Sequence, residues 1–372
     1  MYATTRYTEE KHFLHRNGTM MPLDQPRIAS HTRADAGDTG RRPTLADIAR
    51  QAGVSVATVS KVLNGRNGYS EVTRQKVNDA LATLGYQRTG RAGEPNAAIE
   101  LAVQHLDSDW ILGLLRGIER VVRPLRIGVT VSMVDDLAAM SSDWIVEAAD
   151  RNPVGAIPVC STPDADIAER FEARGIPCVF LDPVGAPADG LLSVRADNWS
   201  GGFLAAQHLI DLGHTRIGVI SGPSNAMNAT ARLAGVRAAF TAAGLTLEND
   251  MCIEATFRMD GGRDAAIALL SRPEPPTAII TGNDVQAMGV YEAARRLNIA
   301  IPYELSVVGY DDIRAAQYLA PPLTTIHQPL EEMGVKAAEL ILAARDGNDA
   351  TGNFILPTTL AERESTAAPL DL

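Results

Sequence analysis

Between residues 97 and 365 the chain alternates short apolar segments with longer amphipathic ones. This alternation predicts parallel sheets flanked by helices, and the stretch is too long for one compact open sheet. We therefore expect an α/β body of two lobes, with ligand bound beyond the carboxyl ends of strands in the cleft between them. The expected strands are residues 98–104, 126–132, 154–160, 177–181, 190–194, 216–221, 277–281 and 305–309. The expected helices include residues 111–123, 163–173, 200–212, 228–243 and 283–297.

Charge is distributed unevenly along the chain. With 34 Lys and Arg against 45 Asp and Glu, the net charge of −11 argues against nucleic acid as a partner when the chain is taken as a whole. Residues 41–95, however, carry nine basic and four acidic side chains, whereas residues 96–372 carry 20 basic and 36 acidic ones. A basic module thus precedes an acidic body. A basic stretch alone fits a solvated surface as well as a DNA contact, so the pattern of the module has to decide.

Several classes of protein are disfavoured by composition. No apolar run approaches the roughly 18–20 residues of a membrane span, and the start of the chain lacks the pattern of a secretion signal. The odd number of cysteines, without nearby histidines, favours neither a disulfide framework nor a zinc site and fits a reducing cytoplasm. We expect no metal, no cofactor and no membrane partner. The cysteines are Cys160, Cys178 and Cys252.

The basic module, residues 43–86, has the pattern of three short helices. Thr44 and Ser55 are typical N-caps, and Gly53 stands where a left-handed residue ends the first helix. Two short helices joined by a Gly-containing turn are typical of a helix-turn-helix, so we expect an all-α three-helix headpiece. The second and third helices are expected over residues 56–63 and from about residue 73 to 84.

In a helix-turn-helix the first turn of the second helix faces base edges in the major groove. Val56 and Ala57 occupy that turn, and Lys61 follows one turn later. Small apolar groups suit thymine methyls and a lysine suits guanine acceptors. The alternatives are that Val56 and Ala57 pack in the core and that the capping residues only cap. The short side chains suited to phosphates are Thr44, Ser55, Thr58, Ser60, Asn64, Ser70 and Thr73.

A family resemblance becomes specific in this module. The segment resembles the headpiece of lactose-repressor/galactose-repressor family regulators, and this resemblance assigns base reading to Val56, Ala57 and Lys61. The matching residues are Thr44-Leu45-Ala46-Asp47-Ile48-Ala49, Ala52-Gly53-Val54-Ser55, Thr58-Val59-Ser60, Asn64-Gly65, Thr73-Arg74-Gln75-Lys76-Val77 and Leu84-Gly85-Tyr86.

Residues 87–96 depart from the family pattern. Family members fold this segment on DNA into a short helix whose leucine wedges into the minor groove. Here two glycines and a proline disfavour a helix and no leucine is present, so we favour a flexible linker. Arg88 and Arg91 remain candidates for a narrow minor groove. The expected domain order is a disordered leader (1–42), the headpiece (43–86), this linker, the two-lobed effector-binding and dimerisation body (97–365) and a tail (366–372).

The same resemblance extends through the body and implies a fold like that of periplasmic sugar-binding proteins. It rests on Gly213-His214-Thr215-Arg216-Ile217-Gly218, Gly282-Asn283-Asp284, Ser306-Val307-Val308-Gly309-Tyr310-Asp311-Asp312 and Pro321-Pro322-Leu323-Thr324-Thr325-Ile326. No phosphate loop is present, because the GxxxxGK spacing is missing.

Polar residues beyond strand ends are the candidate effector contacts. An arginine, a carboxylate and an amide suit polyol hydroxyls, and an aromatic ring suits a sugar face. Against these roles, Asp311 could cap a following helix, Asn283 could be an N-cap and Trp110 could pack between lobes. His214 and His327 are expected to be structural. The candidates, matched to family positions, are Asp107, Trp110, Arg232, Phe257, Asn283, Asp311 and Gln328.

These patterns together predict a DNA-binding transcriptional regulator, and no catalytic motif indicates an enzyme. The resemblance implies a cytoplasmic, nucleoid-associated repressor of sugar-utilisation genes that binds a palindromic operator as a homodimer, with a tetramer left open. A small carbohydrate between the lobes is the expected effector. The alternatives are a nucleoside- or purine-responsive regulator and a sugar-binding transport component.

Overall fold

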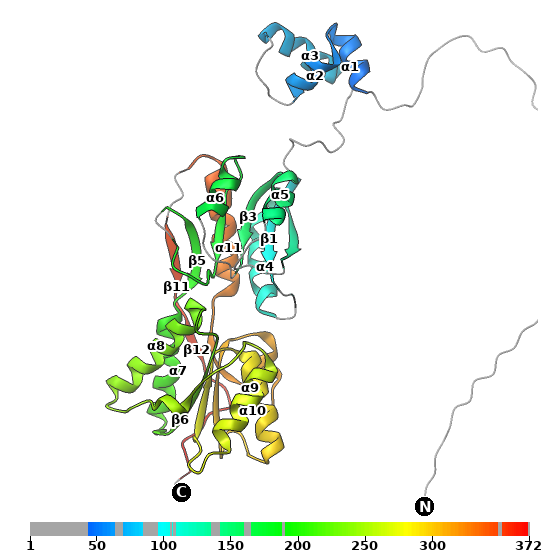
Figure 1. Cartoon of the computed structure of the whole chain (residues 1–372). Coiled ribbons are helices and arrows are strands. Elements are labelled where there is room, and N and C mark those ends of the chain that lie inside the picture. Colours follow the sequence, from blue (N-terminus) through cyan, green and yellow to red (C-terminus); the bar gives the residue numbers. More distant parts are fainter. Residues whose placement is uncertain are drawn as a thin grey trace, which may run out of the picture. The chain divides into compact units, whose positions relative to one another are not determined.

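The computed structural model describes residues 44–63, 70–84, 96–104, 106, 109–134, 142–159, 165–187, 190–348 and 352–370. The chain divides into two compact units, Met1–Gln87 and Arg88–Leu372, each described here by itself (Figure 1). The expected leader, and the linker up to residue 95, lie outside the described residues. Within the described ranges, no helix is long and apolar enough to cross a membrane.

The first unit contains three helices, α1 (Leu45–Ala52), α2 (Val56–Leu63) and α3 (Glu71–Thr83), as the sequence predicts. Gly53 ends α1 in the left-handed conformation, with φ 66° and ψ 35°. Helix α3 begins earlier than expected because the Ser70 hydroxyl accepts a hydrogen bond from Thr73 N at 3.2 Å and caps its first turn. The buried core of the unit consists of Ile48, Ala49, Ala52, Val59, Val77 and Ala80.

The second unit has two lobes. In lobe 1, the strand order β2-β1-β3 continues through two isolated bridges into β4-β5-β11, and all pairings are parallel. The strands are β1 (Asn96–Val103), β2 (Gly128–Met133), β3 (Pro153–Pro158), β4 (Val179–Leu181), β5 (Leu192–Ala196) and β11 (Asn353–Leu356). Helices α4 (Asp109–Val122) and α11 (Leu330–Arg345) share one apolar core with this sheet. Helices α5 (Ser142–Asp150) and α6 (Ala165–Glu172) share the other.

Lobe 2 is built around a six-stranded sheet of order β12-β10-β9-β8-β6-β7, in which only β12 runs antiparallel to its neighbour. The strands are β6 (Ile217–Ser221), β7 (Cys252–Glu254), β8 (Ala278–Thr281), β9 (Ser306–Asp311), β10 (Thr324–His327) and β12 (Thr359–Ala361). Helices α7 (Asn198–Asp211) and α8 (Met227–Ala242) share one core with the sheet. Helices α9 (Met259–Leu270) and α10 (Asp284–Leu297) share the other.

The chain crosses between the lobes three times, at β5 to α7, β10 to α11 and β11 to β12. The first and third crossings are hydrogen-bonded to each other: Asp197 N donates to Leu356 O at 2.8 Å, and Thr358 Oγ1 donates to Asp197 O at 3.2 Å. Because only these short segments connect the lobes, they form the hinge about which one lobe can move relative to the other.

The expected fold class is confirmed: a helical headpiece precedes two lobes of mainly parallel sheet flanked by helices. The expected strands are all present with shifted ends; the strand expected at 190–194, for example, is β5 at Leu192–Ala196. The short strands β7 and β10 to β12, and the helices α5, α9 and α11, were not among the expected elements.

Candidate DNA interface and ligand site

Helix α2 presents the residues expected to read DNA. Val56 is 46% exposed, and Ala57 and Lys61 are also exposed, whereas Val59 on the opposite side of the helix is fully buried. The alternative that Val56 and Ala57 pack in the core is therefore wrong. An exposed apolar pair followed by a lysine is available for contact with base edges.

Several of the hydroxyl groups expected to contact phosphates lie at the N-termini of helices. Thr58 N donates to Ser55 Oγ at 3.1 Å at the start of α2, and Ser70 caps α3 in the same way. At the start of α1, the Thr44 amide and hydroxyl both donate to Asp47 Oδ2, at 2.8 and 2.6 Å. Asn64, Arg88, Arg91 and the side chain of Ser60 lie outside the described residues.

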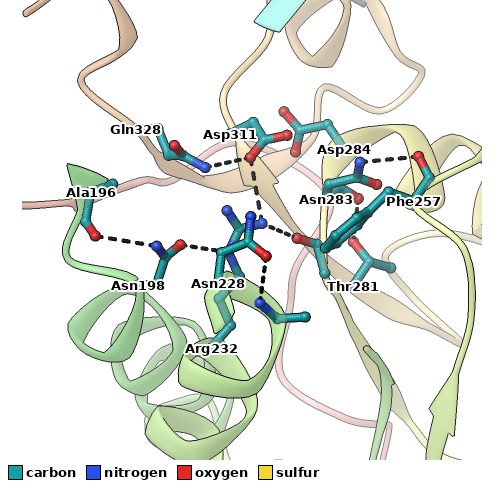
Figure 2. A network of polar contacts seen from close by, with 12 residues as sticks. Ala196, Asn198, Asn228, Arg232, Phe257, Thr281, Asn283, Asp284, Asp311 and Gln328 are labelled. Carbon is teal, nitrogen blue, oxygen red and sulfur yellow. Dashed lines mark hydrogen bonds and ion pairs between the residues drawn. The ribbon is translucent and has the colours of Figure 1, made fainter. Parts of the chain in front are cut away.

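Arg232 on α8 is the centre of the candidate ligand site in lobe 2 (Figure 2). Its guanidinium donates to Asn198 Oδ1 at 2.8 Å and to Gly282 O, and it lies 3.6 Å from Asp311 Oδ1. The Tyr310 ring lies 3.7 Å from the guanidinium carbon. Because Arg232 is only 6% exposed, these partners hold a fixed positive charge out of bulk water.

Asp311 faces Arg232 at the carboxyl end of β9. Gln328 Nε2 donates to Asp311 Oδ1 at 2.7 Å, and the backbone of Asp311 has φ of 109°, a strained value for a residue with a side chain. Burial raises the pKa of Asp311 to about 7, although Arg232 opposes the shift. The alternative that Asp311 caps the next helical turn is wrong, because Asp284 Oδ2 accepts the hydrogen bond of Ile313 N instead.

Phe257 and Asn283 lie next to each other beyond the carboxyl ends of β7 and β8 (Figure 2). Asn283 caps α10, as its alternative interpretation held, through a 2.8 Å hydrogen bond from Gln286 N to Oδ1, and its amide donates to Phe257 O at 3.2 Å. The Phe257 ring packs on Gly222, where an added Cβ would lie only 2.1 Å from the ring. The glycine after β6 thus makes room for the aromatic side chain, and Phe257 lies 5.9 Å from the Arg232 guanidinium.

Two buried polar atoms near Arg232 have no hydrogen-bond partner among the described residues: Gln328 Oε1 and Tyr310 Oη. An unsatisfied buried acceptor costs roughly 1–3 kcal/mol, so a ligand hydroxyl that donated to Gln328 Oε1 would recover that cost. A small cavity of about 20 Å³ also adjoins Arg232 and Tyr310. The arrangement offers donors, acceptors and an aromatic face to a polyol.

Two carboxylates at this site were not predicted. Asp182, directly after β4 and only 2% exposed, accepts from Asn228 Nδ2 at 3.2 Å, and burial raises its pKa. Asp284 is fully buried, accepts from Thr325 Oγ1 at 2.5 Å, and has a pKa raised first by burial and then by Asp311. Asp182 could have been predicted as Asp311 was, because it is a carboxylate at a strand end. Asp284 follows Asn283, which was considered as an N-cap, and no sequence pattern singled out Asp284 itself.

Trp110 packs on the apolar core of lobe 1, and Asp107 lies outside the described residues. His214 is buried and bonded to Thr277 Oγ1, Ser306 Oγ and Ala367 O, as expected of a structural histidine. His327 pairs with Asp312 at 3.0 Å. No metal-ligating group of His, Cys, Asp and Glu occurs in the described part of the chain.

Two known families match separate parts of the chain. Residues 44–89 match "Bacterial regulatory proteins, lacI family", and residues 206–366 match "Periplasmic binding protein-like domain". The ribose operon repressor of Escherichia coli (strain K12) is 35% identical over 80% of this chain and 92% of its own length. The HTH-type transcriptional regulator MalR of Streptomyces coelicolor is 34% identical over 87% and 96%. The HTH-type transcriptional repressor PurR of Photobacterium profundum is 30% identical over 87% and 98%.

Solved structures give the same result. The Lac repressor dimer bound to operator and the anti-inducer ONPF has a TM-score of 0.67 at 29% identity, covering 88% of this chain and all of that one. The complex of transcriptional regulator CelR with cellobiose has a TM-score of 0.66 at 28% identity, covering 87% and 100%. A regulator from Enterococcus faecium with bound ribose has a TM-score of 0.66 at 28% identity, covering 73% and 99%.

Proposed function

Because the chain belongs to the LacI family of bacterial DNA-binding regulatory proteins, we propose that it is a repressor of sugar-utilisation genes whose affinity for operator DNA is controlled by a small carbohydrate. The observation that carries the effector part of this proposal is the buried cluster of Arg232, Asp311 and Gln328. It combines a fixed cation, a carboxylate and an unsatisfied acceptor, and the centre of the Phe257 ring lies 5.9 Å from the cation.

DNA reading belongs to the first unit. Exposed Val56 and Ala57 contact base edges from the first turn of α2, and Lys61 donates to guanine acceptors one turn later. The hydroxyl groups that begin α1, α2 and α3 orient the unit against phosphates. One such unit reads a short half-site, so a homodimer on a palindromic operator supplies the remaining specificity. Arg88 and Arg91 are the candidates for minor-groove contacts beside the headpiece.

Effector binding changes the arrangement of the two lobes when the effector has a higher affinity for one arrangement than for the other. Residues on both sides of the lobe boundary, Asp182 of lobe 1 and Asn228 and Arg232 of lobe 2, lie close together, and Asn228 already bonds Asp182. Such a ligand shifts the population toward the arrangement that it binds more tightly. The size of the shift is limited by the difference between its affinities for the two arrangements. The residues proposed for effector contact are Asp107, Trp110, Arg232, Phe257, Asn283, Asp311 and Gln328, to which the structure adds Asp182.

The protein acts as a binding protein rather than an enzyme, in the cytoplasm and on the nucleoid. The alternative of a transport component does not account for the lacI-type segment at residues 44–89. A purine-responsive regulator remains the second candidate for effector class, because repressors named PurR are among the relatives. The buried Arg232–Asp311 pair favours hydroxyl groups, which both donate and accept.

Thermal unfolding with a panel of sugars, nucleosides and purines tests the effector assignment, since a bound ligand raises Tm by mass action. We expect a sugar to raise Tm of the wild type and to lose that effect in Asp311→Asn. The matched control is Asp260→Asn, the same change at a carboxylate that is 61% exposed, which should respond as wild type does. If only purines raise Tm, the effector is a purine and not a sugar. If a sugar raises Tm of Asp311→Asn as much as that of the wild type, Asp311 is not part of the site.

A further inference from the structure

A second pocket, of about 100 Å³, lies at the first crossing between the lobes. Its walls include Asp182, Arg195 and Ile355 from lobe 1 and Trp199, Met227 and Asn228 from lobe 2. Arg232, Phe257, Asn283, Asp311 and Gln328 do not line it. Asn198 stands between the two sites: its Oδ1 accepts from Arg232, and its Nδ2 donates to Ala196 O at 3.2 Å.

Arg195 gives this pocket an unmet donor. Its Nε is buried without a hydrogen-bond partner among the described residues, and its Nη1 donates to the Met227 sulfur, at 3.7 Å. A thioether is a weak acceptor, and a guanidinium has five N–H donors to satisfy. A buried donor left unmet is costly, so an oxygen acceptor from outside the chain would be favoured beside Arg195.

Trp199 and Ile355 supply the apolar surface of the pocket, and Ile355 on β11 is the register partner of Arg195 on β5. Trp199 is 47% exposed, and its ring stacks on Phe203 with centroids 5.6 Å apart, so the indole is held in place while a large area stays open to solvent. Ile355 is 51% exposed on β11. An exposed aromatic ring beside a guanidinium and amide groups suits the alternating apolar and hydroxyl surfaces of a sugar ring.

The charge of the pocket favours a neutral occupant. Asp182 and Asp197 line it together with Arg195, so a phosphate or carboxylate ligand would meet carboxylates as well as the guanidinium. Hydroxyl groups fit both kinds of partner, because one hydroxyl oxygen accepts from Arg195 while its proton, or a neighbouring hydroxyl, donates to a carboxylate.

We propose that this pocket is a second ligand site, which adjoins the Arg232 site at Asp182 and binds a small neutral polyol such as a monosaccharide against Trp199 and Arg195. Because its walls come from both lobes beside a crossing segment, an occupant contacts both sides of the hinge and biases their arrangement. The two sites then act on the same equilibrium, and binding at one changes affinity at the other.

The fluorescence of Trp199 tests this site directly. The chain has three tryptophans, so the variant Trp110→Phe/Trp144→Phe leaves Trp199 as the only indole. Its emission is titrated with D-ribose, D-xylose, L-arabinose, D-glucose and D-galactose. We expect a saturable change with at least one sugar, and an at least tenfold weaker response after Arg195→Gln or after Ile355→Arg, which fills the pocket from an exposed position. Val146→Arg, the same kind of change at a 45% exposed site on α5, is the control and should leave the response intact.

A further substitution separates this site from the effector site. In the Trp199-only protein, adding Asp311→Asn or Phe257→Ala should keep the Trp199 titration. In the protein that retains Trp110, the same substitutions should remove stabilisation by the effector. The proposal is overturned if no sugar changes Trp199 emission, if Ile355→Arg titrates like its parent, or if both Asp311→Asn and Phe257→Ala abolish the response. Failure of the effector proposal itself would instead appear as an unchanged Tm response in Asp311→Asn.

Discussion

At the scale of single residues, the buried carboxylate of Asp311 is the most informative group of the ligand site. Burial raises its pKa to about 7, so near neutral pH it is divided between the protonated and the ionised form. Only the ionised form makes an ion pair with Arg232 while it accepts the hydrogen bond of Gln328 Nε2. Proton binding and effector binding are therefore linked at this residue.

We predict that effector affinity rises with pH through about 7. A ligand that requires ionised Asp311 binds with release of a proton below the pKa, so its Kd should fall by up to tenfold per pH unit as pH rises and then level off above the pKa. Isothermal titration between pH 5.5 and 8.5 measures this dependence. A Kd that is constant over this range, or that rises with pH, would contradict the assignment.

Most residues of the candidate ligand site can be predicted from the sequence, because one rule, polar residues beyond strand ends, selects residues such as Asn283 and Asp311. The detailed contacts cannot be predicted in this way. The Gln328 bond to Asp311 joins residues at the carboxyl ends of the neighbouring strands β10 and β9, and the contact of the Tyr310 ring with Arg232 depends on how α8 packs on the sheet. Asp182 was missed although it obeys the same rule, and the space that Gly222 leaves for the Phe257 ring depends on tertiary packing, which the sequence does not show.

At the scale of elements, three pairs of helices pack through glycines. In the pair α7 and α8, a Cβ at Gly202 would lie 2.0 Å from Arg232 O and one at Gly235 2.0 Å from Trp199 O. Gly117 and Gly334 do the same for α4 and α11, and Gly262 and Gly289 for α9 and α10. The close approach of α7 to α8 brings Asn198 within hydrogen-bond reach of Arg232, so helix packing sets the geometry of the site.

We predict that Gly235→Ala destabilises the protein by about 1–3 kcal/mol, because the added methyl group forces the two helix backbones apart. Urea unfolding, followed by a spectroscopic signal of the second unit, measures the loss in the free energy of unfolding. Effector affinity should also fall, because Asn198 moves away from Arg232. Ala234→Ser, at an exposed neighbouring position of α8, is the control and should stay within about 0.5 kcal/mol of wild type. Unchanged stability in Gly235→Ala would show that the helices tolerate a wider separation.

Helix α2 carries a separate prediction. Lys61→Ala combined with Val56→Ala and Ala57→Gly should weaken operator binding at least tenfold while effector affinity stays the same, because these side chains lie outside the core of the first unit. Gel-shift titration and isothermal titration measure the two affinities. Val72→Ala, at a position of α3 that is 66% exposed, is the control and should bind operator as the wild type does. Normal operator binding by the triple variant would refute the reading assignment.

The elements predicted well are those with strong periodicity or caps, such as α1 with Thr44 and Gly53 at its two ends. The missed strands β7 and β10 to β12 have only three or four residues, too few to show a period of two. Helix α11 follows β10 after Gln328 and Pro329, and nothing in its own sequence shows that it returns the chain to lobe 1. That return depends on tertiary contacts with α4 and the sheet.

At the scale of the whole molecule, the chain separates a basic DNA-binding unit from an acidic two-lobed body. Alternating strands and helices over such a length predicted two lobes, but the three crossings that form the hinge became visible only in the structure. The acidic body discourages nonspecific contact with DNA, which leaves docking to the basic unit. Effector control therefore requires that a change between the lobes be transmitted to the spacing of two headpieces in a dimer.

We propose that a ligand at the Arg232–Asp311 site controls affinity for DNA. Fluorescence anisotropy on a palindromic operator selected from random DNA, with and without the sugar that raises Tm, measures this control. We expect this sugar to change the operator Kd of the wild type at least tenfold, or about 1.4 kcal/mol, and to leave the Kd of Asp311→Asn unchanged. Equal operator affinity of the wild type with and without the stabilising sugar would contradict the proposed control.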